Sequence, residues 1–260
     1  MVFCPLASGS GGNAAYVGFG GRHYLVDAGI SARRTMKALG RIGVDCLHGI
    51  FVTHEHSDHI AGIEALSRRF GLDVYASPKT CRYLLSLEKF KNVKKEQMKP
   101  IATGEPLHIG DTEIVAFRVA HDACEPVGYS FVSGGAKLAV ATDLGWGGTD
   151  CAAEAMRGAK VIMLESNHDL EMLQRGRYPP HLKARVAGER GHLSNHAAGL
   201  LLAEAVVPGH TIVCLAHLSE ENNTPMLACD TVMRILEARG AVPARLYAAD
   251  RDYPGERVEL

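Results

Sequence analysis

Short apolar runs alternate with polar, turn-forming stretches along the whole chain. In the first half, four runs have the length and composition of buried strands; they are residues 14–18, 23–26, 50–52 and 74–76. Three stretches carry apolar residues at helical spacing and lie at 32–39, 62–70 and 78–87. Ser77 is a suitable N-cap for the last of these, with Pro78 at the first helical position. The first half therefore predicts one sheet covered by helices.

The second half repeats this order, with strands first and helices after. Its expected strands are residues 106–109, 112–119, 127–133, 137–141, 160–164, 212–215 and 246–248. Its expected helices are residues 151–158, 170–176, 181–186, 197–206 and 226–239, and Gly240 closes the last. One sheet from each half favours an α/β protein built as a four-layer αββα sandwich, with its site at the rim between the sheets. No tandem repeat divides the chain, so residues 1–260 are expected to form a single domain.

Composition and charge exclude several classes of protein. The chain is 47% hydrophobic and 22% charged, an ordinary globular balance. A formal net charge of -1 gives no global attraction to nucleic acid or membranes, so any such attraction must come from local patches. The seven cysteines are scattered without a CxxC pair, which favours a reducing compartment. We expect a cytoplasmic protein with no membrane contact and no obligate protein partner.

A histidine-rich loop follows the expected strand 50–52. It contains His54, His56, Asp58 and His59. Loops at the carboxyl ends of strands are where α/β proteins place their chemistry, and neutral imidazole and carboxylate are ligands for zinc and similar cations. This spacing predicts a metal site, and the alternative is a solvated polar loop.

Other polar residues also follow apolar strands and are expected to converge on the same rim. His121 follows strand 112–119, Asp143 follows strand 137–141, and His217 follows strand 212–215. Asp27 follows strand 23–26 and would either cap the next helix or support the histidine loop. Asn13 ends a glycine-rich loop that would approach a ligand closely.

Taken together, these residues resemble the metallo-β-lactamase-fold hydrolases. The resemblance implies that one metal is bound by His54, His56 and His121, a second by Asp58, His59 and His217, and that Asp143 bridges the two. It implies two divalent ions, zinc or manganese, with iron also compatible with such ligands.

A narrower similarity is to the YycJ/WalJ group of bacterial proteins. It rests on seven blocks in the same order and spacing, residues 8–13, 122–123, 126–129, 142–145, 164–169, 191–195 and 217–223. That group implies a cytoplasmic 5′-to-3′ DNA exonuclease linked to DNA repair.

The chemistry expected of such a site is an in-line phosphoryl displacement. Two ions about 3.5–4 Å apart generate a hydroxide at neutral pH, and the bridging hydroxide would attack phosphorus. Asp58 and His192 are the expected catalytic side chains. His192 follows Gly191 and precedes a helix, so it would protonate the leaving oxygen or, alternatively, only cap that helix. His168 is expected near the site.

The segment between Asp143 and His217 is also informative. It spans 74 residues, which leaves no room for the large β-CASP insertion of many RNA-processing relatives. It includes a basic arm, defined by Arg175, Arg177, Lys183 and Arg185, with an aromatic residue and two prolines. The arm would guide DNA toward the metals, and the alternative is a solvated connection.

Four functions remain in competition. The leading hypothesis is a two-metal phosphodiesterase acting on DNA ends. The first alternative is a phosphodiesterase for a small cyclic or nucleotide substrate, and the second is a thioester or lactone hydrolase. A binding protein with a vestigial site is the last, and the complete set of ligands argues against it.

Overall fold

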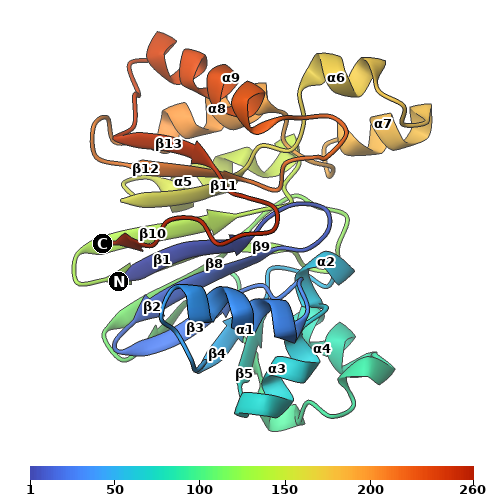
Figure 1. Cartoon of the computed structure of the whole chain (residues 1–260), viewed down its shortest axis with the longest axis vertical. Coiled ribbons are helices and arrows are strands. Elements are labelled where there is room, and N and C mark those ends of the chain that lie inside the picture. Colours follow the sequence, from blue (N-terminus) through green and yellow to red (C-terminus); the bar gives the residue numbers. More distant parts are fainter.

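Two sheets pack face to face and helices cover both outer faces in the computed structural model, which describes all 260 residues (Figure 1). Each sheet has seven strands, in the orders β14-β1-β2-β3-β4-β5-β6 and β13-β12-β11-β10-β9-β8-β7. The expected αββα sandwich is therefore confirmed. The chain passes from one sheet to the other between β6 and β7, near its middle, as the order of the elements predicts.

The first sheet is antiparallel on one side and parallel on the other. Its strands are β1 (Val2–Ala7), β2 (Ala14–Phe19), β3 (Arg22–Val26), β4 (Gly49–Phe51), β5 (Asp73–Ala76), β6 (Met98–Pro100) and β14 (Val258–Glu259). From β3 to β6 all pairs are parallel, so β3, β4 and β5 end at the same edge.

The second sheet has the same mixed character. Its strands are β7 (Pro106–Ile109), β8 (Thr112–Arg118), β9 (Val127–Ser133), β10 (Ala136–Ala141), β11 (Val161–Glu165), β12 (Ile212–Ala216) and β13 (Arg245–Ala248). Strands β10 to β13 are parallel neighbours, so β10, β11 and β12 also end at one edge. The residues that follow these ends form the rim that carries the site.

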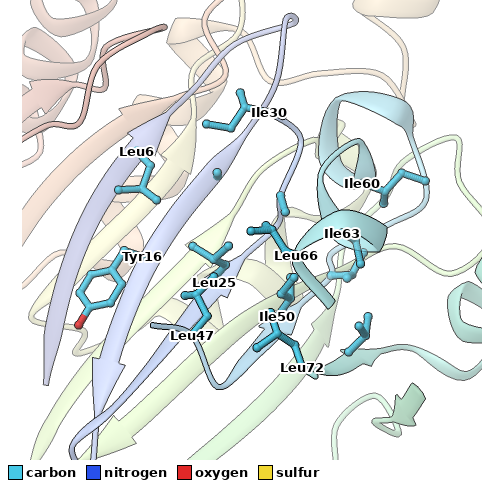
Figure 2. Packing of buried hydrophobic residues seen from close by; sticks show 14 of the residues in the cluster. Leu6, Tyr16, Leu25, Ile30, Leu47, Ile50, Ile60, Ile63, Leu66 and Leu72 are labelled. Carbon is cyan, nitrogen blue, oxygen red and sulfur yellow. The ribbon is translucent and has the colours of Figure 1, made fainter. Parts of the chain in front are cut away.

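Helices on the outer faces close the two outer cores. The α-helices are α1 (Ala32–Arg41), α2 (Ser57–Ile60), α3 (Ile63–Phe70), α4 (Pro78–Ser86), α5 (Thr149–Met156), α6 (Leu170–Arg175), α7 (Pro180–Val186), α8 (Asn195–Ala205) and α9 (Pro225–Ala238). Short 3-10 helices occupy Glu88–Phe90, Lys95–Gln97 and Trp146–Gly148. Figure 2 shows Ile63 and Leu66 of α3 packed near Leu25 and Ile50 of the first sheet. Helices α6 and α7 instead project beside the second sheet (Figure 1).

An aromatic cluster between the sheets supports the strand that leads into the histidine loop. The Phe51 ring on β4 meets the Phe131 ring edge-on, with centroids 5.2 Å apart. Tyr129 is fully buried, and its hydroxyl donates to the Val52 carbonyl at 2.7 Å. The start of the histidine loop is thus tied to the opposite sheet, which limits its freedom to move.

The expected helices and strands lie within two residues of those observed. Four strands and helices were not predicted, β1, β6, α2 and β14, and neither were the three 3-10 helices. Strand β14 pairs with β1 in the first sheet, Phe3 opposite Val258, although it follows the second half of the chain. A run of two residues is too short for periodicity to reveal, so only tertiary pairing identifies it. No helix has the length and apolar character required to cross a bilayer.

Candidate metal centre

Seven side chains from four strand-end segments meet at the rim in two adjoining groups. The ligand atoms of His54, His56 and His121 lie within 4.8 Å of one another, and so do those of Asp58, His59 and His217. The seventh is Asp143, whose Oδ2 is 2.9 Å from His59 Nε2 and whose Oδ1 is 3.8 Å from His121 Nε2. Asp143 thus lies between the groups, and two further groups that include it overlap them: His54 with His59, and His217 with Glu165 and His192. The division of the ligands between two metals stays a prediction.

Hydrogen bonds hold the imidazoles with one particular nitrogen turned inward. Nδ1 of His59 lies 2.7 Å from Asp27 Oδ2, and Nδ1 of His217 lies 2.7 Å from Glu165 Oε1. Nδ1 of His121 lies 3.1 Å from the Gly191 carbonyl. A proton on each Nδ1 satisfies these acceptors and leaves Nε2 with a free lone pair, the arrangement that metal-binding histidines require.

Thr53 and Asp27 extend this anchoring to His54. Thr53 Oγ1 donates to Asp27 Oδ2 at 2.8 Å and lies 3.0 Å from His54 Nδ1. Asp27 Oδ1 accepts the Thr53 amide at 2.8 Å. Of the two roles considered for Asp27, the structure supports contact with the histidine loop, because Ser31 caps α1 through its hydroxyl.

Three loops are joined closely around Asp58. The Asn13 amide donates to the Asp58 carbonyl at 2.8 Å, and the Gly29 amide donates to the Asn13 carbonyl at 2.7 Å. A Cβ at Gly29 would lie 1.5 Å from that Asp58 carbonyl oxygen, so only glycine permits this approach. Asn13 Nδ2 also lies 3.4 Å from Asp58 Oδ2 and 3.1 Å from His59 Nε2. Asn13 therefore orients this corner of the site.

Three of the site residues adopt a left-handed backbone conformation that is uncommon outside glycine. The φ angles are 59° at Asp27, 55° at Asp143 and 53° at His217, and no other non-glycine residue has a positive φ. Each such residue is strained by about 1 kcal/mol or more. Because strained residues cluster at functional sites, their restriction to this rim supports the rim as the functional site.

Charge is concentrated at the centre of the site. Burial lowers the pKa of the His54 and His121 imidazoles, which keeps them neutral. Burial also opposes charge on His59 and His217, but the surrounding carboxylates together outweigh it. Asp143 and Asp27 raise the pKa of His59, and Asp143, Asp58 and Glu165 raise the pKa of His217 to about 10. Burial would raise the pKa of Asp143, but His217 and His59 outweigh it and keep this carboxyl ionised.

Several buried polar atoms are left without partners, and they test whether a metal fits. His54 Nε2, Asp143 Oδ2 and His217 Nε2 are buried and accept no hydrogen bond. An unsatisfied buried polar atom costs about 1–3 kcal/mol. Imidazole nitrogens and carboxylate oxygens that point at a common centre are the donor set of first-row divalent cations. The site therefore fits divalent metal, which would satisfy these atoms.

Glu165 is a central residue of the site that sequence reasoning did not select. Its side chain is fully buried, and its Oε1 lies 2.8 Å from His192 Nδ1 as well as 2.7 Å from His217 Nδ1. Oε2 accepts the amides of Leu144 and Leu193, each at 3.0 Å. Burial would raise its pKa, but His192 outweighs burial and lowers it to about 2. Because Glu165 ends strand β11, the strand-end rule that selected Asp143 would also have found it.

His192 lines a pocket beside the metal centre, whereas His168 is buried outside the ligand groups. His192 precedes α8, but the helix cap is Ser194, whose hydroxyl accepts the Ala197 amide, so His192 is not the cap. It lines a pocket of about 280 Å³ beside the site. Burial opposes charge on His192, yet Glu165 raises its pKa. His168 is buried next to Ser194 in an isolated bridge and belongs to none of the ligand groups.

The basic arm lies on α6, α7 and the turn between them. Arg175 pairs with Glu171 at 2.7 Å, and Lys183 Nζ donates to the Gln174 carbonyl at 2.6 Å. Arg177 is exposed and forms no ion pair or side-chain hydrogen bond. Arg185 approaches the metal centre most closely: it lines the same pocket as His192 and pairs with Asp122 at 2.7 Å. Asp122 Oδ1 in turn lies 3.2 Å from His121 Nε2.

An αββα sandwich with imidazoles and carboxylates gathered at one rim defines the class of metal-dependent hydrolases with the metallo-β-lactamase fold. The chain belongs to this superfamily: residues 22–217 match the family model described as "Beta-lactamase superfamily domain", and the protein is a hydrolase of that class.

Similar proteins place it more narrowly. It is 40% identical to Exodeoxyribonuclease YycJ of Bacillus anthracis over 92% of this chain and 90% of the relative. It is 35% identical to Exodeoxyribonuclease WalJ of Streptococcus pneumoniae over 89% of this chain and 86% of the relative. The similarity to the YycJ/WalJ group is thereby confirmed. The metallo-β-lactamase fold protein YhfI of Bacillus subtilis has the same fold, with a TM-score of 0.69, 18% identity and 98% of both chains covered.

Proposed function

We propose that this protein is a two-metal phosphodiesterase that degrades DNA from its ends in the 5′-to-3′ direction, in the cytoplasm and in the service of DNA repair. The observation that carries the metal-dependent part is the set of imidazoles anchored through Nδ1 around Asp143. The DNA substrate is supported by the two relatives named exodeoxyribonucleases, which match along nearly their whole length.

The residues would divide the metals as their geometry groups them. His54, His56 and His121 would hold one ion, and Asp58, His59 and His217 the other. Asp143 would contact both, and zinc or manganese fits this set of nitrogen and oxygen ligands. When bound, divalent ions polarise phosphoryl oxygens and supply a nucleophile from water at neutral pH.

Asp58 and His192 would act on opposite sides of the reacting phosphate. The Asp58 side chain is 24% exposed, whereas that of Asp143 is 3% exposed, so Asp58 is the ligand carboxylate that reaches incoming water and would orient it. His192 holds a proton more firmly than an ordinary histidine because of Glu165, and it faces the pocket that would receive the leaving strand. It would protonate the leaving oxygen, the role of a general acid.

The test is direct. The purified protein would be assayed with zinc or manganese on bis(p-nitrophenyl) phosphate and on duplex DNA labelled at either the 5′ or the 3′ end. A 5′-to-3′ exonuclease releases a 5′ label first as a mononucleotide, whereas a 3′ label remains on shortening strands. Turnover of a cyclic nucleotide without any attack on DNA would instead support the small-substrate alternative. Release of the 3′ label first would overturn the direction.

We expect Glu165→Gln to lower kcat on DNA by about 10–100-fold, the usual effect of removing a residue that orients metal ligands. Glutamine keeps the shape, but its amide nitrogen cannot accept from His192 or His217. Steady-state kinetics and elemental analysis measure the effect. Glu204→Gln, on the exposed side of α8, is the matched control. Unchanged kcat in Glu165→Gln would mean that the Glu165 carboxylate is not needed to orient His192 and His217.

Replacing Arg175 and Arg177 together by alanine should weaken DNA binding and reduce its salt dependence. Each phosphate contact contributes about 0.9 to the slope of log K against log salt on duplex DNA, so two contacts predict a change of about 1.8. Arg68→Ala/Arg69→Ala on α3 is the matched control, because Arg68 pairs with Glu64 at i,i+4 as Arg175 does with Glu171. An equal loss on bis(p-nitrophenyl) phosphate would mean that the arm supports the site and not the DNA.

A further inference from the structure

A continuous line of surface hollows leads from the metal centre to the exposed face of α1. The pocket of about 280 Å³ beside His192 shares Ser219 with a second hollow of about 360 Å³. The second hollow shares Asp252 and Tyr253 with a third, of about 200 Å³, against α1. These shared residues link the three hollows into one groove. Arg185 of the basic arm lines its first pocket, whereas no residue of α6 or α7 lines the other two hollows.

Uncompensated positive charge lines the far end of this groove. Helix α1 contains four cations and no acidic residue, and Arg34, Lys37 and Arg41 face the third hollow at helical spacing. Arg34 pairs with Asp252 at 2.7 Å, but neither Lys37 nor Arg41 forms an ion pair. These two charges are therefore free to meet a polyanion.

The acidic groups along the groove are already engaged. Glu220 pairs with Arg251 at 2.8 Å. Asp250 Oδ1 accepts the backbone amides of Asp252 and Tyr253, at 2.8 and 2.9 Å. Backbone amides leave the negative charge of Asp250 in place, but no acidic side chain forms an ion pair with Lys37 or Arg41.

An exposed aromatic ring stands between the cations and the metal centre. Tyr253 is 58% exposed, and the Arg41 guanidinium lies 5.1 Å from the centroid of its ring. The Arg41 guanidinium lies over the ring and positions it, and the solvent-exposed part of the ring can stack on a base. Alternation of cations with such a ring is the pattern by which proteins bind single-stranded nucleic acid. A paired base could not turn its face to the ring, so the chemistry favours a single strand.

The groove is tied directly to a proposed metal ligand. Ser8 Oγ accepts the His217 amide at 2.8 Å, and the Ser8 amide donates to the Asp250 carbonyl at 3.1 Å. The turn that carries Tyr253 is thus fixed relative to His217. A strand seated in the groove would keep its phosphates in register with the metal centre.

We infer that this groove binds the single-stranded portion of the DNA substrate, with Lys37 and Arg41 on phosphates and Tyr253 stacked on a base. The inference rests on the proposed function, which supplies DNA as the substrate, and adds a binding path that neither the ligand set nor the basic arm provides.

The test compares Lys37→Ala/Arg41→Ala and Tyr253→Ala with the wild-type protein and with Arg68→Ala/Arg69→Ala. The control removes two helical cations, one of which, Arg69, stacks on Phe70 at 5.1 Å as Arg41 does on Tyr253. The metal-loaded protein would be titrated with a long single strand of phosphorothioate DNA at several salt concentrations. Turnover of bis(p-nitrophenyl) phosphate and a dinucleotide would be measured alongside.

The double variant should reduce the slope of log K against log salt by about 1.4, at about 0.7 for each contact on single strands. Tyr253→Ala should weaken binding about 5- to 100-fold, as loss of one base stack does, with the slope unchanged because tyrosine is neutral. The small substrates should be turned over as by the wild type, because they do not reach α1. Lys37→Gln/Arg41→Gln should reproduce the double variant.

An unchanged slope in both double variants at Lys37 and Arg41 would overturn the inference, as would an equal change in the Arg68 and Arg69 control. An equal loss on the dinucleotide would overturn it as well. Failure of the proposed function is distinct, because it would appear as a wild-type protein that cleaves bis(p-nitrophenyl) phosphate but no DNA.

Discussion

Asp143→Ala is expected to abolish hydrolysis of DNA, with kcat/KM lower by more than about 100-fold. This exceeds the 10–100-fold range for residues that only orient ligands. The Asp143 carboxylate reaches both ligand sets, at 2.9 Å from His59 and 3.8 Å from His121. Its loss should also release metal, which elemental analysis of the purified variant would show as a fall from the proposed two ions per chain.

Asp73→Ala is the matched control for this experiment. Asp73 is a half-buried carboxylate at the start of β5, at the opposite edge of the first sheet, and it pairs with Lys99 at 3.8 Å. It should leave metal content and activity unchanged. A wild-type protein with a single ion, together with an Asp143→Ala variant of equal content, would refute the bridging role.

His192→Ala should keep both metals and the folded state but lower kcat on DNA by about 10²–10⁴-fold, the usual contribution of a positioned general acid. The loss should be smaller for bis(p-nitrophenyl) phosphate, because p-nitrophenolate needs little protonation to leave. A deoxyribose hydroxyl needs full protonation. Comparing the two losses distinguishes a proton donor from a group that only stabilises charge, which would penalise both substrates alike.

His196→Ala provides the control, since His196 is an exposed histidine in the first turn of α8. Normal DNA turnover in a fully metallated His192→Ala variant would exclude any catalytic role. Loss of one ion would instead show that His192 is a metal ligand. One of the seven residues proposed as ligands would then have to be reassigned.

Much of the site could be predicted because its residues follow a local rule. His54, His121, Asp143 and His217 each come after an apolar run, and a strand can be recognised from such a run alone. The rule states where a polar residue lies in the fold, although it does not assign its chemistry. Glu165 obeys the same rule, but its importance arises from accepting His192 and His217 at once. That depends on β11 lying between β10 and β12, which is tertiary information.

Other features had no local signal at all. Arg190 donates to the His121 carbonyl at 2.8 and 3.1 Å, yet it stands in the sequence as one more exposed cation. The groove along Tyr253 joins segments from residues 8, 37 and 253. Contacts between segments so far apart in the chain leave no periodic pattern, and only the folded molecule brings them together.

The left-handed residues have a consequence for how this protein responds to selection. Asp27, Asp143 and His217 keep a strained backbone with φ between 53° and 59°, and glycine would adopt the same conformation freely. Glycine at these positions would relieve the strain, but it would also remove the hydrogen bonds of Asp27 to Thr53 and His59 and the charge partner of His59 and His217. The strain is therefore retained by the same side chains that organise the site, and engineers seeking a more stable enzyme should hold these three positions fixed and seek stabilising changes elsewhere.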